Sequence, residues 1–196
     1  MKTIALCCAL WLATPLAWGQ ATAINQPPSW AKNVVWYQIM VERFNNGDKG
    51  NDQTADDISI PAIGQSPPAG WSVTTWTKDW FAQEAWASKA GLPFDQTLLH
   101  RRYGGDLKGV IEKLDYLKDL GITALFLNPI NHAPSLHKYD ASSYHHVDAN
   151  FGPDAKGDRK MMAAENPEDP TTWKWTAADK QFLKLIQEAH KRNMKV

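Results

Sequence analysis

Oxygen-bearing side chains are concentrated in the segment NNGDKGND, residues 45–52. Within it, Asn46, Asp48, Asn51 and Asp52 follow the spacing N-x-D-x-x-N-D. A tight loop with this spacing can direct several oxygen atoms to one point, and calcium binds six to eight such oxygens at about 2.3–2.6 Å. Four side chains are too few for a complete site, and the same residue types are common in solvated turns. The segment predicts a calcium loop only if further ligands come from elsewhere in the chain.

A second group of polar and aromatic side chains lies between residues 130 and 146. Its members are His132, His137, Lys138, Tyr139, Asp140, Tyr144, His145 and His146. Imidazole, phenol and carboxylate groups bind sugar hydroxyls, so a carbohydrate site is one interpretation. A zinc site is the rival, although cysteine partners and a helical i, i+4 histidine pair are both missing. A third interpretation is a His–Tyr pair that only braces the loop.

The elements that must position these groups are an amphipathic helix and a buried strand. Apolar residues recur on one helical face, at Leu107, Val110, Ile111, Leu114, Leu117 and Leu120. Asp106 can cap the first turn, and Gly121 suits the left-handed conformation found at helix ends. Residues 122–127 are apolar without alternation, as in a parallel strand covered on both faces. A helix joined to such a strand by one glycine predicts a right-handed β/α repeat, in a sheet or a barrel.

Further elements extend this β/α pattern. Residues 34–41 predict a first strand, residues 178–192 a second amphipathic helix, and residues 194–196 the opening of a third strand. Two long segments, 50–100 and 130–178, follow the first and second strands. Because both precede helices, we expect them to be loops on the carboxyl-terminal rim, where barrels build their active sites.

The first long segment is rich in tryptophan: Trp71, Trp76, Trp80 and Trp86. A short helix is expected around Asp79–Ala90, and the weak periodicity indicates a functional loop outside the core. Tryptophan can stack on sugar faces or fasten a long loop to a barrel, so no site is assigned there. The second segment includes an insertion, residues 153–175, with Trp173 and Trp175 open to the same two interpretations.

Two strings connect these patterns to a known family. GGDLKGVIEKLDYLKDLGITALFLNPI, residues 104–130, resembles the first helix and second strand of the catalytic barrel of the α-amylase superfamily, glycoside hydrolase family 13. HKYDASSYHHVDANFG, residues 137–152, resembles the second-strand loop of its neopullulanase and cyclomaltodextrinase branch. The resemblance covers residues 34–196 and implies an α/β fold, the N-terminal part of a TIM (β/α)8 barrel with long loops after strands 1 and 2. The 153–175 insertion departs from the plainer members of the family.

The resemblance also implies site residues. The calcium loop of the family is completed by the carbonyl group of Gly104 and by Asp106, which gives Ca²⁺ the ligand set Asn46, Asp48, Asn51, Asp52, Gly104 and Asp106. His137 would bond the sugar hydroxyls at the cleaved bond, and the ring of Tyr139 would lie against the sugar. The catalytic nucleophile and acid/base of the family lie on later strands, beyond Val196. Asp140 and Asp148 match neither position and are not assigned to catalysis.

Composition bounds the partners and the compartment. The chain has 21 basic and 21 acidic residues, a net charge of zero, which gives no field to recruit nucleic acid or anionic lipid. Residues 1–19 read as a secretory signal peptide, with cleavage as late as residue 23, and predict a secreted or periplasmic protein without a membrane span. Both cysteines, Cys7 and Cys8, lie in that segment, so disulfides and thiol catalysis are excluded from the mature chain. Acylation of either cysteine in a lipoprotein is the alternative.

The predicted organisation is therefore a signal peptide, a lead-in at residues 20–33 and the first part of a catalytic barrel at residues 34–196. A retaining α-glucan hydrolase, acting on α-1,4 and in part α-1,6 bonds of starch, maltooligosaccharides, cyclodextrin or pullulan, is the expected complete protein. The 196 residues alone are expected to be inactive. A non-catalytic glucan-binding protein or a truncated remnant is the alternative. The pattern gives no indication of oligomeric state.

Overall fold

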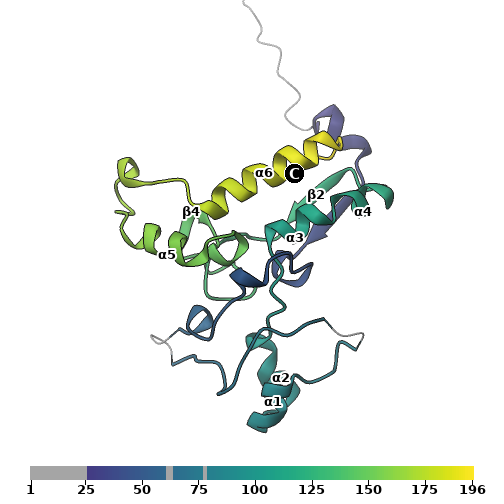
Figure 1. Cartoon of the computed structure of the whole chain (residues 1–196). Coiled ribbons are helices and arrows are strands. Elements are labelled where there is room, and N and C mark those ends of the chain that lie inside the picture. Colours follow the sequence, from purple (N-terminus) through teal and green to yellow (C-terminus); the bar gives the residue numbers. More distant parts are fainter. Residues whose placement is uncertain (1–25, 61–63, 77–78) are drawn as a thin grey trace, which may run out of the picture. The chain divides into compact units, whose positions relative to one another are not determined.

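The computed structural model describes residues 26–60, 64–76 and 79–196. The chain separates into two units, Met1–Asn33 and Val34–Val196. In the first unit the described part forms the 3-10 helix η1 (Ser29–Asn33), and the expected signal peptide lies outside the described residues. The second unit contains the remaining helices and strands, several of which are labelled in Figure 1. Among the described helices, none is both long and apolar enough to cross a membrane.

Two parallel strands form the centre of the second unit. Strand β1 (Trp36–Ile39) pairs with β2 (Ala124–Leu127) so that Trp36 lies opposite Ala124. On the other side of β2, Lys195 forms an isolated parallel bridge with Ala124. The expected first two strands and the opening of the third are therefore confirmed, in the order of a β/α repeat.

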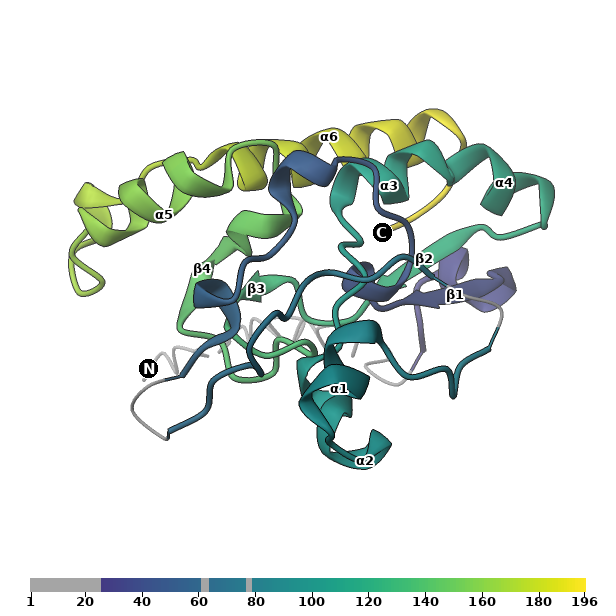
Figure 2. The same cartoon turned by 60° about the horizontal axis from the view of Figure 1, so that its bottom comes forward.

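Three helices cover one face of this strand pair: α3 (Leu107–Glu112), α4 (Leu114–Asp119) and α6 (Ala177–Lys191). Figure 2 shows all three on the same side of β1 and β2. Their apolar faces and the strands bury one continuous core, which includes Ile39, Val41, Leu107, Val110, Leu114, Leu117, Leu125, Leu185 and Ala189. The helix face anticipated from the 3.6-residue period is thus the buried face.

The opposite face of the strands is open, which corrects the expectation that β2 is covered on both sides. Trp36 is 49% exposed and Phe126 is 53% exposed. With Gln38 these side chains line a cavity of about 610 Å³. In a closed barrel, the inward face of each strand is covered by side chains from the other strands. Among the described residues, this sheet consists of β1, β2 and the bridge at Lys195, so that face remains exposed.

The predicted single helix from Leu107 is interrupted at Lys113. The Lys113 N–H donates to the carbonyl of Val110, three residues back, and the residue has φ −98° and ψ 2°. This tighter turn separates α3 from α4 while Leu114 and Leu117 stay buried. The predicted ends are confirmed: Asp106 accepts a hydrogen bond from the Gly109 N–H at 2.6 Å, and Gly121 has φ +85°.

The first long segment contains more structure than expected. It forms α1 (Ala85–Ala90), which begins later than the helix expected around Asp79–Ala90, and α2 (Phe94–Thr97). Ile58, Trp71, Trp86 and Ala87 bury a second, smaller core beneath it. Trp71 and Trp86 are therefore packing residues, whereas Trp76 and Trp80 are 41% and 47% exposed. The prediction of a loop outside any core was wrong here, because clustered apolar side chains bury one another even without a helical or strand period.

The second long segment is also partly regular, contrary to the expectation of a loop. It forms β3 (Asn131–His132), which pairs antiparallel with β4 (Ser143–Val147), and α5 (Ala155–Ala163) within the insertion. The described part of the unit also contains short 3-10 helices: η2 (Val41–Arg43), η3 (Lys49–Asn51), η4 (Asp56–Ile58), η6 (Leu98–His100), η7 (Ala149–Phe151) and η8 (Pro170–Thr172). The Asp158 carboxylate of α5 accepts hydrogen bonds from the Ala177 and Ala178 N–H groups and so ties α5 to the start of α6.

Candidate functional site

Asp106 joins the oxygen-rich loop to the start of α3. The carboxylate of Asp106 is fully buried, and its Oδ2 atom accepts hydrogen bonds from the Gly47 and Asp48 N–H groups at 3.2 and 2.8 Å. The Asn51 side-chain amide lies 3.4 Å from the same oxygen. Burial raises the pKa of Asp106 above its ordinary value, although these hydrogen bonds act in the opposite direction. The residue therefore serves as a helix cap and as an anchor of the loop.

Asn46, Asp52 and Gly104 lie together beside this anchor. The Asn46 Nδ2 atom donates to Asp52 Oδ1 at 2.6 Å. Gly104 has φ +74°, and a Cβ atom built there would collide with both side chains. Burial raises the pKa of Asp52. The chain must therefore have glycine at this point, both for its conformation and for the approach of its backbone to the two side chains.

Two buried oxygens of the loop, Asn46 Oδ1 and Asn51 Oδ1, have no hydrogen-bond partner among the described residues. The carboxylates of Asp52 and Asp106 lie beside these oxygens, and burial disfavours their charge. A hard cation would give the unpaired oxygens a partner and would offset the charge of the carboxylates. The residues thus fit calcium. The Asp48 carboxylate accepts a hydrogen bond from the Gly50 N–H at 2.9 Å within its own turn.

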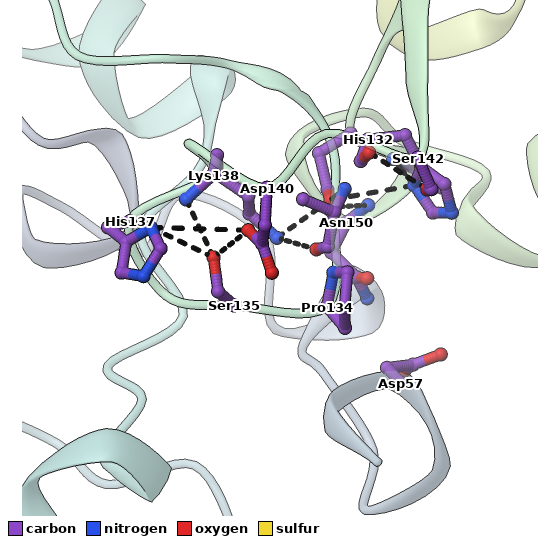
Figure 3. A network of polar contacts seen from close by, with 12 residues as sticks. Asp57, His132, Pro134, Ser135, His137, Lys138, Asp140, Ser142 and Asn150 are labelled. Carbon is purple, nitrogen blue, oxygen red and sulfur yellow. Dashed lines mark hydrogen bonds and ion pairs between the residues drawn. The ribbon is translucent and has the colours of Figure 1, made fainter. Parts of the chain in front are cut away.

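Lys138 is the buried residue of the HKYD string, and Figure 3 shows it with His137 and Asp140 beside Ser135. His137 and Tyr139 are exposed, with ring centroids 5.8 Å apart, whereas Lys138 between them is 2% exposed and has φ +60°. The Ser135 hydroxyl lies 3.1 Å from His137 Nδ1, and the Tyr139 N–H donates to the same nitrogen at 3.2 Å. The left-handed conformation at Lys138 turns the two rings outward while its own side chain enters the interior.

Lys138 holds this loop through a buried ion pair with Asp148. The Lys138 Nζ atom lies 2.7 Å from Asp148 Oδ2 and donates to the Ala133 carbonyl at 2.7 Å. Although burial alone would raise the pKa of Asp148, the Lys138 ammonium and His132 hold that pKa well below its usual range. Asp148 is therefore a structural anion, which agrees with leaving it out of catalysis.

Sequence reasoning missed a second link, formed by Glu42 and Arg102. Glu42 is 1% exposed and accepts hydrogen bonds from the Tyr103 and Gly104 N–H groups. Arg102 donates a hydrogen bond to the Pro134 carbonyl at 3.0 Å. Burial lowers the pKa of Arg102 to about 10, although the nearby Glu42 carboxylate acts to raise that pKa. The segment before α3 is thereby fixed to the end of β1 and to the loop after β2. The position of Glu42, a charged residue directly after an apolar run, was the feature of the sequence that could have indicated this link.

Most of the second unit matches one family. Residues 38–166 match the family model described as "Alpha amylase, catalytic domain". The chain belongs to the α-amylase family. This confirms the resemblance, and the fold is the N-terminal part of a TIM (β/α)8 barrel.

The chain is similar to proteins named as a neopullulanase, a cyclomaltodextrinase and a pullulan hydrolase. It is 36% identical to Neopullulanase 2 of Thermoactinomyces vulgaris over 169 residues, which is 86% of this chain and 19% of that protein. It is 40% identical to a cyclomaltodextrinase of Geobacillus thermopakistaniensis over 127 residues, 65% of this chain and 16% of that one. Among solved structures, the type III pullulan hydrolase from Thermococcus kodakarensis matches with a TM-score of 0.54 and 27% identity, over 84% of this chain and 22% of that chain. The chain thus spans about a fifth or less of these curated relatives.

Proposed function

We propose that this chain is the N-terminal part of a retaining α-glucan hydrolase that cleaves α-1,4 bonds, with α-1,6 bonds as a second target. The observation that carries the proposal is the pair His137 and Tyr139, exposed side by side on the loop after β2 and held there by the buried Lys138–Asp148 pair. An imidazole beside an aromatic ring offers a hydrogen bond to sugar hydroxyls and a flat surface for a sugar face. The relatives named for neopullulanase and cyclomaltodextrinase support the choice of glucan.

The test is substitution of the two ring residues in the complete protein. H137A and Y139A should each lower kcat/KM on maltooligosaccharides, cyclodextrin or pullulan by about 10- to 100-fold, since each lost contact contributes about 1–3 kcal/mol. Y116A on α4, whose side chain is 56% exposed, is the matched control and should leave kcat/KM unchanged. Unchanged kinetics in H137A and Y139A would remove the two residues from the substrate site.

Retaining cleavage needs two carboxyl groups about 5–5.5 Å apart. We place both on strands that follow Val196, as in the rest of the family, and expect the 196 residues alone to be inactive. Hydrolysis of any of these glucans by a purified preparation of the 196 residues would contradict this. A preparation that binds glucan tightly, folds cooperatively and does not cut would favour a glucan-binding role.

The oxygen-rich loop is proposed to hold Ca²⁺ through Asn46, Asp48, Asn51, Asp52, the Gly104 carbonyl and Asp106. Its chemistry would be structural: a bound divalent cation offsets the buried carboxylates and supplies partners for the two unpaired amide oxygens. The loop lies between the end of β1 and the start of α3, so the cation would fix the first rim segment to the helix. His137 and Tyr139 keep their roles as substrate-positioning groups.

We also propose that the N-terminal segment directs export of the protein. The basis is the apolar run and the small residues within residues 4–23. The mature protein should begin after Gly19 or Ala23. N-terminal sequencing of protein from the periplasm or medium tests this, and a chain that still carries Lys2 would contradict it.

A further inference from the structure

Two histidines and a glutamate meet where the 153–175 insertion contacts β4. His145 and His146 are consecutive on β4, and Glu165 follows α5. The His146 Nε2 atom lies 2.7 Å from Glu165 Oε2, and His145 Nε2 lies 3.2 Å from the same oxygen. One potential ligand atom from each of the three residues falls within 4.8 Å of the others. The Glu165 and His146 side chains are only 4% and 3% exposed.

The far side of the His146 ring is fixed by Asp179 on α6. Asp179 Oδ2 lies 2.8 Å from His146 Nδ1, and its other oxygen accepts from the Val147 N–H at 2.9 Å. Asp179 also takes part in a capping box with Thr176, so it cannot turn away without loss of the helix start. The carboxylate on Nδ1 fixes the orientation of the ring with Nε2 toward Glu165, and such a carboxylate is the usual support of a metal-binding histidine.

His145 is oriented by the insertion itself. Its ring stacks on Trp173 with centroids 3.9 Å apart and planes 10° apart. The Trp173 indole N–H donates to the carbonyl of Asn166 at 3.1 Å. Since Asn166 directly follows Glu165 in the chain, this hydrogen bond fixes the tryptophan close to Glu165. Both imidazoles are therefore held with Nε2 toward one carboxylate oxygen before any ligand binds.

We propose that His145, His146 and Glu165 bind a zinc-class divalent cation, with Asp179 as the supporting carboxylate. Two imidazoles and one carboxylate form a common zinc ligand set, completed by a water molecule. A cavity of about 380 Å³, lined by the three residues together with His132, Ser142 and Arg159, gives room for that water and an approach from solvent.

The spacing needs only a small adjustment. Ligand atoms at about 2.0–2.2 Å from zinc in tetrahedral geometry lie roughly 3.3 Å from one another. The observed separations from Glu165 Oε2, 2.7 and 3.2 Å, require an outward shift of the carboxylate by about half an ångström. The other oxygen of this carboxylate, Oε1, accepts a hydrogen bond from the Lys174 N–H at 2.7 Å, so the shift must turn the carboxylate about that contact.

Zinc would fix the insertion to the barrel segment. Without a metal, the imidazole of His146 lies between two carboxylates, Glu165 and Asp179, and a proton on each nitrogen satisfies both. Zinc binding would replace the proton on Nε2 and release it to solvent. The site is chemically distinct from the loop anchored at Asp106, whose ligands are all oxygens, so the two cations can be titrated separately.

The test is isothermal titration of the chelator-treated complete protein with ZnCl2, in the presence of excess calcium. The wild type should bind one zinc ion that calcium does not displace. H146Q, E165Q and H145Q should each weaken zinc binding by at least about 100-fold, and D179N by about 10- to 100-fold. H190Q, an exposed histidine on α6, is the control and should bind like the wild type.

E165Q and H145Q leave the His146–Asp179 contact in place, so they report on metal ligation even if H146Q does not fold. X-ray absorption of the zinc-loaded protein should show nitrogen and oxygen ligands only. No calcium-resistant zinc binding in the wild type, or equal binding in E165Q and H145Q, would overturn the site.

Discussion

Removal of the Lys138 charge should destabilise the rim loop strongly. Lys138 and Asp148 are each about 1% exposed at the side chain, and their charged atoms are 2.7 Å apart. At an effective dielectric constant of about 20, a pair at that distance gains roughly 6 kcal/mol, most of which offsets the cost of taking both charges out of water. K138M keeps the length of the side chain and leaves the Asp148 carboxylate buried without its cation.

The expected cost of K138M is about 3–5 kcal/mol, the range for one charge left unpaired in the interior. Asp148 keeps its hydrogen bonds from the Ala133 and Asn150 N–H groups at 3.1 and 3.0 Å, which favours the lower end of that range. The double variant K138M/D148N removes the stranded charge. It should therefore be more stable than K138M by at least about 1 kcal/mol.

The assay is urea denaturation of the complete protein and of each variant, read as the free energy of unfolding. K180M, which removes an exposed lysine from α6, is the control and should stay within about 0.5 kcal/mol of the wild type. A cost below about 1 kcal/mol for K138M, or a double variant less stable than K138M, would refute the argument that this pair holds the loop.

Three further predictions concern the calcium loop, the approach of α3 and the second core. D106N retains a side chain able to cap α3 but loses the charge. Calcium at 100 times Kd should stabilise the wild type by about 2.7 kcal/mol and raise its melting temperature, and this rise should nearly vanish in D106N. A rise in D106N equal to that of the wild type would contradict the site. G109A should destabilise the protein by more than about 2 kcal/mol, because the added Cβ would collide with the Asn45 carbonyl, although alanine favours helices. A free energy of unfolding at or above that of the wild type would contradict this. W71A should cost about 3–5 kcal/mol in the same urea assay, since Trp71 is 9% exposed and packs in the second core, whereas W80A, at 47% exposure, should cost less than about 1 kcal/mol.

The sequence by itself determined the elements whose partners are near in the chain. The spacing from Leu107 to Leu117 gave the buried face of α3 and α4, and the run ending at Leu127 gave a parallel strand. Asp106 and Gly121 marked the helix ends because capping and positive φ depend on one residue type at one position. The family followed from the two strings, since their residues recur in a fixed order.

Only the tertiary structure decided which side chains meet across long separations. Lys138 in the HKYD string looked like one more polar rim residue, and its positive φ and burial against Asp148 follow from the packing of the loop. Glu165 carried no signal beside the histidines, because it lies 19 residues from His146 and reaches it only when α5 folds back toward β4. Local patterns record the period of one element. Contacts between elements depend on how those elements pack in three dimensions, and the pattern of a single sequence does not predict that packing.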